Sequence, residues 1–162
     1  MRRFARLLFV ALAACVLHAC GKPVDLKQAL QVADVSTGWF DAGIVDGKNK
    51  LVPTVSFRVE KNTPDEVRPV AVNVLFKQIK GDTDAEWDDV FLQRIDFTEG
   101  NRTPVLTLRP GAGATGEPPQ SRAEMLKNSY FVDIRAVIFA KQSSSNWVEL
   151  ARFDIPRQIL PH

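Results

Sequence analysis

Short runs of alternating apolar and polar residues dominate this chain after its first thirty positions. In residues 54–60 every second side chain is apolar, so that Val55, Phe57 and Val59 share one face. Residues 70–77 repeat the pattern with three valines and Phe76. A period of two is typical of a β-strand that buries one face. Five further runs rich in β-branched and aromatic residues are predicted to be strands: 32–45, 87–97, 105–109, 130–141 and 147–155.

The segments between these runs carry turn residues. Clusters of Gly, Asn, Asp, Ser and Pro lie at residues 46–49, 61–65, 80–82, 99–101 and 142–146. Residues 130–141 are apolar on both faces, which predicts a central strand that is covered on both sides. Helical patterning is confined to residues 121–128 and to a turn or two after Asp25. About seven short strands joined by polar turns predict an all-β, antiparallel β-sandwich with one short helical turn.

The first twenty residues follow a different pattern. Residues 1–6 carry three arginines, and an uncharged, mostly apolar run of thirteen residues, 7–19, comes next. Thirteen residues are too few for a helix that spans a bilayer, and the order of charged, apolar and small residues is typical of a secretory signal. We therefore expect a signal peptide over residues 1–19.

The stretch at residues 17–20 (Leu-His-Ala-Cys), which ends in Cys20, resembles the lipobox of bacterial lipoproteins. The resemblance implies cleavage before Cys20, lipid modification of its thiol and a location in the cell envelope. Gly21 after the cysteine implies the periplasmic face of the outer membrane. A second cysteine, Cys15, is the alternative lipidation site, but cleavage there would leave only eight apolar residues after the last arginine. An ordinary secretory signal with an incidental cysteine is the remaining alternative.

Removal of residues 1–19 changes both the net charge and the set of reactive side chains that remain. The full chain has 21 basic and 19 acidic residues, and three arginines leave with the signal. The remainder then has 18 basic and 19 acidic side chains. The remainder lacks the basic surface that nucleic-acid binding needs. Both cysteines and one of the two histidines lie at residues 15–20, and the other histidine is His162. Disulfides, Cys–His and Ser–His–Asp catalysis, and zinc sites built on Cys and His are thereby excluded, and we expect no catalytic residue, metal or cofactor.

A tyrosine gives the sandwich a more specific interpretation. The stretch at residues 106–111 leads through a long loop, 111–128, to Tyr130 at the head of a predicted strand. This order resembles the corner between the fifth and sixth strands of fibronectin-type and immunoglobulin-like domains, where a tyrosine hydroxyl ties the corner to nearby backbone. The resemblance implies an immunoglobulin-like sandwich and a corner-tying role for Tyr130; the domain is also similar to exported domains of the FxLYD type. We expect a signal peptide at 1–19, a lipid-anchored tether at 20–31 and one β-sandwich domain at 32–162.

Carboxylates are the remaining candidates for chemistry. Residues 82–89 hold five of them, and oxygen ligands from three could bind calcium: Asp82, Asp84 and Glu86. Trp87 and Gln93 stand where an EF-hand loop needs glycine and glutamate, so a solvated hairpin is the preferred interpretation. A hydrolytic pair from distant segments would have to come from three other acids: Asp133, Glu149 and Asp154. Asp133 and Arg135 lie two apart on one face of the predicted strand 130–141, so an ordinary cross-strand ion pair explains them better.

Three aromatic residues are candidates for a protein interface: Trp39, Phe40 and Trp87. Trp39 and Phe40 are neighbours in a predicted strand, so one should face the core and the other solvent, unless both pack inside. An exposed tryptophan is a frequent anchor at interfaces. Trp147 is expected in the core because it shares a predicted face with Ala151, Phe153 and Ile155. The loop at 110–119 is a further candidate for partner contact because of its length.

These observations favour a lipid-anchored, non-catalytic protein-binding or assembly module of the cell envelope. Its expected partners are the membrane, through the lipid on Cys20, and an envelope protein. The alternative is a small-ligand or glycan binder that uses Trp39 or Trp87 as a stacking platform. A carboxylate-dependent hydrolase is the third alternative.

Overall fold

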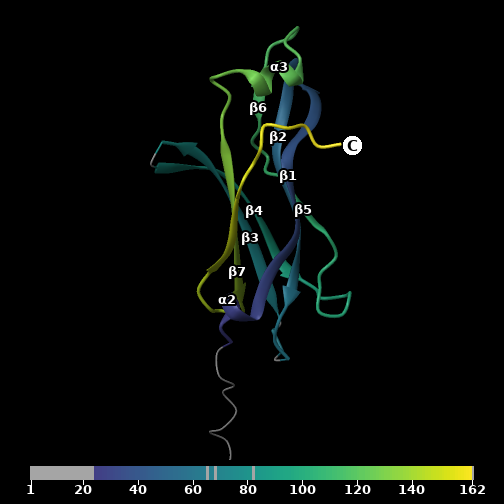
Figure 1. Ribbon diagram of the computed structural model, residues 1–162, viewed down its shortest axis with the longest axis vertical. Coiled ribbons are helices and arrows are strands. Elements are labelled where there is room, and N and C mark those ends of the chain that lie inside the picture. The colour runs from purple at the N-terminus through teal and green to yellow at the C-terminus, as the bar shows by residue number, and fades with distance from the viewer. Residues whose placement is uncertain (1–23, 65, 68, 82, 162) are drawn as a thin grey trace, which may run out of the picture.

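The structure is a computed structural model of the chain, and it describes residues 24–64, 66–67, 69–81 and 83–161. Within these residues it contains eight strands in two antiparallel sheets and two short helices (Figure 1). The elements are, in chain order, α2 (Leu26–Ala29), β1 (Leu30–Val45), β2 (Lys48–Lys61), β3 (Val70–Lys80), β4 (Thr83–Ile95), β5 (Leu106–Leu108), β6 (Ala114–Gly116), α3 (Arg122–Lys127), β7 (Ile134–Gln142) and β8 (Val148–Asp154). The predicted all-β sandwich is confirmed.

The strand order is that of an immunoglobulin-like sandwich. One sheet has the order β1-β2-β5, with β6 also paired to β2, and the other has the order β4-β3-β7-β8. With β4 lettered C′ and the short β6 left without a letter, these are the orders A-B-E and C′-C-F-G. β5 and β6 lie one after the other along the same edge of β2, opposite residues 55–57 and 49–51 respectively. The segment predicted as a loop at 110–119 therefore contains one strand more than expected, β6.

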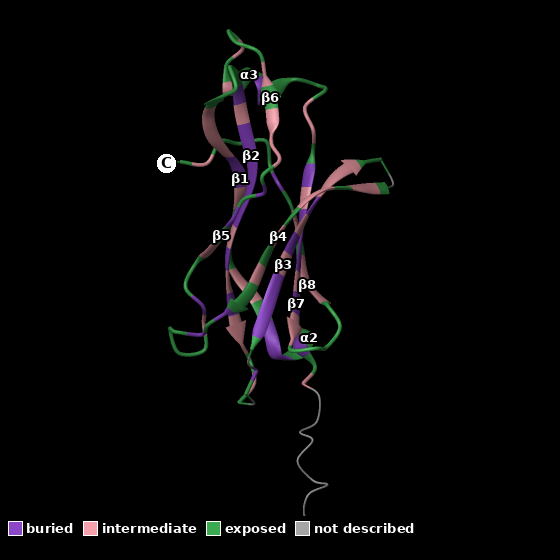
Figure 2. Cartoon of the chain, turned by 180° about the vertical axis from the view of Figure 1, so that it is seen from behind, coloured by how far each residue is buried: buried purple, intermediate pink, exposed green. Residues whose placement is uncertain are grey.

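The core follows the predicted alternation. The inward side chains of β2 and β3 are fully buried: Val55, Phe57, Val59, Val70, Val72, Val74 and Phe76. The intervening residues of β2, such as Ser56 and Arg58, are partly exposed. β7 lies in the middle of its sheet and buries Val137 on its outer face as well as Ile138 on its inner face. Figure 2 shows the buried residues concentrated along β2, β3 and β7.

The domain begins before residue 32, so the expected boundary of the tether is wrong. The carboxylate of Asp25 caps α2 by accepting a hydrogen bond from the Lys27 amide at 3.0 Å. Leu26, Ala29 and Leu30 are all buried and belong to the main core. A helix of one turn is stable here because its apolar side covers the end of the sandwich. The signal, Cys15, Cys20 and the first part of the tether lie outside the described residues.

Candidate functional site

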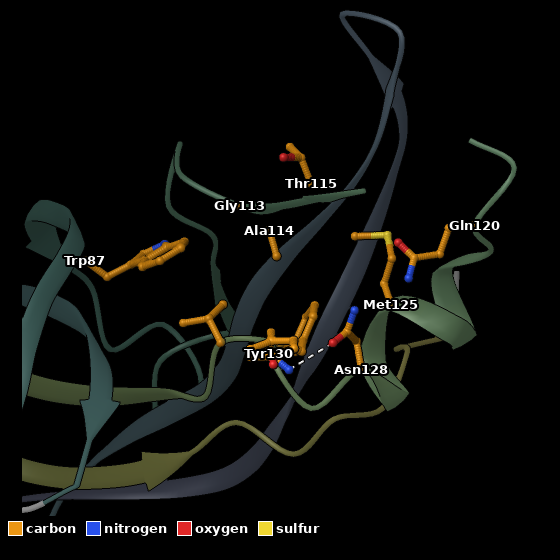
Figure 3. Close-up of a pocket in the computed structure, with 10 residues that line it drawn as sticks. Trp87, Gly113, Ala114, Thr115, Gln120, Met125, Asn128 and Tyr130 are labelled. Carbon is orange, nitrogen blue, oxygen red and sulfur yellow. Dashed lines mark hydrogen bonds between the residues drawn. The ribbon is translucent and has the colours of Figure 1, made fainter. Parts of the chain in front are cut away.

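A pocket of about 310 Å³ (Figure 3) is lined in part by β6 and α3, which lie at the end of the sandwich opposite α2 (Figure 1). Its walls come from β4, from β6 and the residue before it, from α3, and from the segments that join β6 to α3 and α3 to β7. The lining residues are Trp87, Gly113, Ala114, Thr115, Gln120, Met125, Asn128, Tyr130, Phe131 and Val132. All ten are uncharged, and aromatic, aliphatic and amide groups are mixed. Such a lining suits a neutral, partly apolar group better than an ion.

Trp87 reaches the pocket through an irregularity in β4. The pairing of β3 with β4 shifts between Phe76 and Lys77, which face Asp88 and Glu86, so Trp87 is the extra residue of a β-bulge. A bulge changes the direction of the side chain that it carries. In Figure 3 the Trp87 ring stands on one side of the pocket, and Met125 and Tyr130 stand on the other. The indole Nε1 of Trp87 is buried and has no hydrogen-bond partner among the described residues.

The opposite wall is held by α3, whose start was predicted. The amide of Glu124 donates to the hydroxyl of Ser121 at 3.2 Å, and the Ser121 amide donates to the Glu124 carboxylate at 2.6 Å. This capping box sets the first turn of a helix that turns Met125 toward the pocket. A Cβ on Gly116 would lie 2.8 Å from the Met125 sulfur, so the absence of a side chain in β6 makes room for this wall.

Arg157 fixes the segment between α3 and β7, and sequence reasoning missed it. Its guanidinium donates to both carboxylate oxygens of Asp133, at 2.7 and 2.9 Å. It also donates to the carbonyl oxygens of Asn128 and Phe131, each at 2.9 Å. Because the Asp133 carboxylate stabilises the charged form, the pKa of Arg157 lies above its usual value. A lone arginine after the last strand carries no local signal of this role.

The expected corner-tying role of Tyr130 is wrong. Tyr130 lies before β7, is 95% exposed, and its hydroxyl makes no hydrogen bond with any described residue. Only its backbone is held, by an amide that donates to Asn128 Oδ1 at 2.9 Å (Figure 3). β6 and α3 occupy the connection between β5 and β7, so Tyr130 follows a long insertion instead of closing a tight corner. It forms part of the pocket rim.

Trp39 and Phe40 face opposite ways, as expected of strand neighbours. Trp39 is 0% exposed, and its ring packs edge-on against Phe131, with the centroids 4.6 Å apart. Trp39 is therefore a core residue and is not an exposed anchor or stacking platform. Phe40 is partly buried under the guanidinium of Arg109, 3.8 Å from its ring centroid. The contact with Phe131 connects the core to the pocket wall.

The prediction that Trp147 lies in the core is wrong. It precedes β8, is 40% exposed, and lies over the outer face of its sheet, where Lys141 contacts its ring. The pairing of β7 with β8 leaves Leu150 as an extra residue in β8. The bulge lies between Trp147 and Ala151 and reverses which residues face the core. Trp147 therefore faces outward, whereas a regular strand would place it on the same face as Ala151.

The acidic residues do not converge on one site. Each acid of the hydrolytic alternative contacts an arginine of its own: Asp133 contacts Arg157, Glu149 contacts Arg152 and Asp154 contacts Arg135. Asp84, of the calcium alternative, is 3.2 Å from Arg135; Glu86 is exposed, and Asp82 lies outside the described residues. Across the described ranges, no group of three or more His, Cys, Asp or Glu side chains could hold a metal ion.

Comparison with known proteins adds no family to this geometry. No protein-family model matches the chain, and no curated protein matches it. In the part of the chain that the structure describes, neither helix has the length or the apolar character needed to cross a membrane. The pocket beside Trp87 and Tyr130 is therefore characterised by its own residues.

Proposed function

We propose that this chain is a lipid-anchored, non-catalytic binding module of the cell envelope. A lipid on Cys20 would hold it at the membrane, and the pocket would receive a side chain of an envelope protein. The observation that carries the proposal is that α2 lies at one end of the sandwich, whereas α3 and β6, which line the pocket, lie at the other (Figure 1). Leu26 is six residues after Cys20, a reach of ~20 Å when extended. The α2 end would therefore stay near the bilayer while the pocket faces away from it.

The composition of the pocket supports a protein partner. Its volume of about 310 Å³ is at the lower end of the range of ligand sites, roughly 300–1,000 Å³, and suits one protruding side chain. Tyr130 stands at the rim with nearly all of its surface free. Tyrosine and tryptophan are enriched among the residues that dominate binding energies at interfaces. Tyr130 and Trp87 would thus contact the partner from the rim and the wall.

A small neutral ligand or glycan is the second candidate. It is favoured by the Trp87 ring in the wall together with the amide side chains of Gln120 and Asn128, because sugars combine a face that stacks with edges that hydrogen-bond. The two candidates differ in what the pocket retains. A protein partner would be cross-linked to the rim, whereas a soluble sugar would change Trp87 fluorescence in the purified protein.

The first experiment replaces Tyr130 by a photoreactive benzoylphenylalanine in the cell that produces the protein. We expect a discrete adduct with one envelope protein, and we expect Trp87→Ala to reduce it. The matched control places the same photoreactive group at Val105, which is also exposed but lies next to β5, away from the pocket. Equal adducts from both positions, or no adduct from Tyr130, would contradict a partner at the pocket.

The second experiment tests the anchor. Cys20→Ser should abolish incorporation of labelled fatty acid and release the protein from the membrane fraction, because the thiol that carries the lipid is lost. Cys15→Ser is the matched control and should leave both unchanged. Labelling that depends on Cys15 alone would show that Cys15 is the residue that carries the lipid. Labelling that depends on neither cysteine would remove the anchor from the proposal.

A further inference from the structure

A second apolar surface lies on the outer face of the β4-β3-β7-β8 sheet. Trp147 and Phe91, which are 40% and 51% exposed, meet edge to face with their ring centroids 6.0 Å apart. The ammonium of Lys141 is 4.8 Å from the centre of the Trp147 ring. Phe91 and Lys141 also border a shallow hollow whose floor includes Ala71. We call Phe91, Lys141 and Trp147 the Trp147 strip.

The strip lies at the α2 end of the sandwich. α2 packs against β7 and β8, and the turn between these two strands lies beside it in both views (Figures 1 and 2). Lys27 of α2 is close enough to Glu149 to help Arg152, the larger cause, hold the pKa of that carboxyl below its usual value. Glu149 is two residues after Trp147. The strip and the start of the domain are therefore neighbours.

The distance to the expected lipid is short. Cys20 precedes Val24, the first described residue, by four positions, and four extended residues reach only ~14 Å. A lipid on Cys20 would hold Val24, two residues before α2, within this reach of the bilayer. The strip would then stay at the height of the lipid headgroups.

We infer that the Trp147 strip rests on the lipid headgroup region, an inference that depends on the lipid anchor of the proposed function. Tryptophan favours this region because its ring is apolar and its N–H is polar. Lysine extends its ammonium to the phosphates while its methylene groups stay in apolar surroundings, and anionic lipids attract it. Phe91 adds apolar surface with no polar group to desolvate.

The other half of the same sheet face limits the contact. There the outward side chains form an ion-pair group in which Arg135 contacts both Asp84 and Asp154. Charged groups of this kind remain hydrated and do not enter a bilayer interface readily. The contact is therefore confined to the α2 end, so the domain stands tilted and the pocket beside α3 stays clear of the membrane.

The test attaches the protein to a membrane by a chemical coupling at Cys20. The form that begins at Cys20 keeps the whole described core, which starts at Leu26, and it contains a single thiol. Cys20 can therefore be coupled to a maleimide phospholipid in vesicles, whether or not a cell lipidates it. Brominated phosphatidylcholine in these vesicles quenches tryptophan emission on contact. We expect weaker emission than in ordinary vesicles, and we expect Trp147→Phe to abolish this difference.

Two controls separate contact by the strip from general proximity. Trp87→Phe should keep the wild-type loss of emission. Trp147→Phe combined with Ile44→Trp moves the indole to an exposed position near the end of β1 that contacts α3 through Asp41 and Arg122, and it should remain unquenched. Each variant must unfold at the wild-type temperature.

Two results would overturn the inference. One is an equal loss of emission in the wild type and in Trp147→Phe. The other is no loss of emission in either protein, which would show that the strip does not contact lipid and would favour a protein partner for it. Because the coupling is chemical, a failure of the Cys20→Ser experiment would remove the lipid anchor without changing this measurement.

Discussion

The backbone amide of Trp39 in β1 donates a hydrogen bond to the carbonyl oxygen of Gln158, with the nitrogen and oxygen 2.8 Å apart. The amide of Leu160 donates back to the Trp39 carbonyl at 2.9 Å. The segment after β8 thus crosses from one sheet to the other and pairs in parallel with β1 at Ile159. It occupies part of an edge strand that would otherwise be open to other chains.

This contact makes Gly38 sensitive to substitution. A Cβ there would lie 2.8 Å from Leu160 Cδ2 and 3.1 Å from the carbonyl oxygen of Gln158. The backbone carbonyl cannot move aside without breaking the pairing with Trp39. Gly38→Ala should lower the free energy of unfolding by about 1–3 kcal/mol, as overpacking does, in urea titrations.

The control for this prediction is Gly111→Ala. The nearest atom to its new Cβ is Asp88 Oδ2 at 3.7 Å, an ordinary contact, so stability should change by no more than about 0.5 kcal/mol. Equal losses in the two variants would show that the C-terminal segment adapts to the new methyl group.

Arg157→Lys tests whether the guanidinium geometry holds the pocket wall. Lysine keeps the charge but cannot donate simultaneously to Asp133, Asn128 and Phe131. We expect a loss of about 1–3 kcal/mol in the free energy of unfolding and faster amide hydrogen exchange over residues 128–133. Arg152→Lys is the matched control, because the Arg152 side chain is more exposed than that of Arg157 and its described hydrogen bonds go to Glu149 alone, so it should contribute less. Unchanged exchange over 128–133 in Arg157→Lys would remove the positioning role.

Tyr130→Ser should separate binding from stability. Since the side chain is 95% exposed, the free energy of unfolding should change by no more than about 0.5 kcal/mol. Capture of the partner through the pocket should fall, because the aromatic ring at the rim is lost. Trp39→Ala provides the contrast, since loss of a fully buried indole should cost about 3–5 kcal/mol. Full partner capture by Tyr130→Ser would exclude the rim from the interface.

Acid should destabilise the domain in part through Glu124. Hydrogen bonds from the Ser121 backbone and side chain hold the pKa of Glu124 below the ordinary value of 4.5. A carboxyl with a lowered pKa stabilises the fold above the unfolded pKa, and this contribution is lost as the pH falls below 4.5 through the folded pKa.

Glu124→Gln tests this contribution. Glutamine can still accept the hydrogen bond of the capping box but does not titrate. When the pH is lowered from neutral to acid, the melting temperature of the variant should therefore fall less than that of the wild type. Parallel losses in the two proteins would assign the acid sensitivity to other carboxyls, among them Glu149 beside Arg152.

Local patterns were sufficient wherever a strand kept its register. The alternation in β2 and β3 placed the inward valines and phenylalanines correctly, because the period of side chains in a strand is two. The helical pattern of residues 121–128 located α3, and the capping box of Ser121 and Glu124 is the local reason why the helix starts there. The prediction for Tyr130 failed because β6 and α3 lie between β5 and β7. The helical pattern of residues 121–128 was visible locally, but the pairing of β6 with β2 was not.

The sequence by itself determined the all-β class, the positions of most strands and the lack of thiol and imidazole groups between residues 21 and 161. These properties depend only on residue type and spacing. The tertiary structure alone decided which residues meet: Arg157 with Asp133, Trp39 with Gln158, and Trp87 with Tyr130 around one pocket. The physical reason is that a one-residue bulge exchanges the faces of a strand, as the bulge at Leu150 does for Trp147, and distant pairing sets the neighbours on each face.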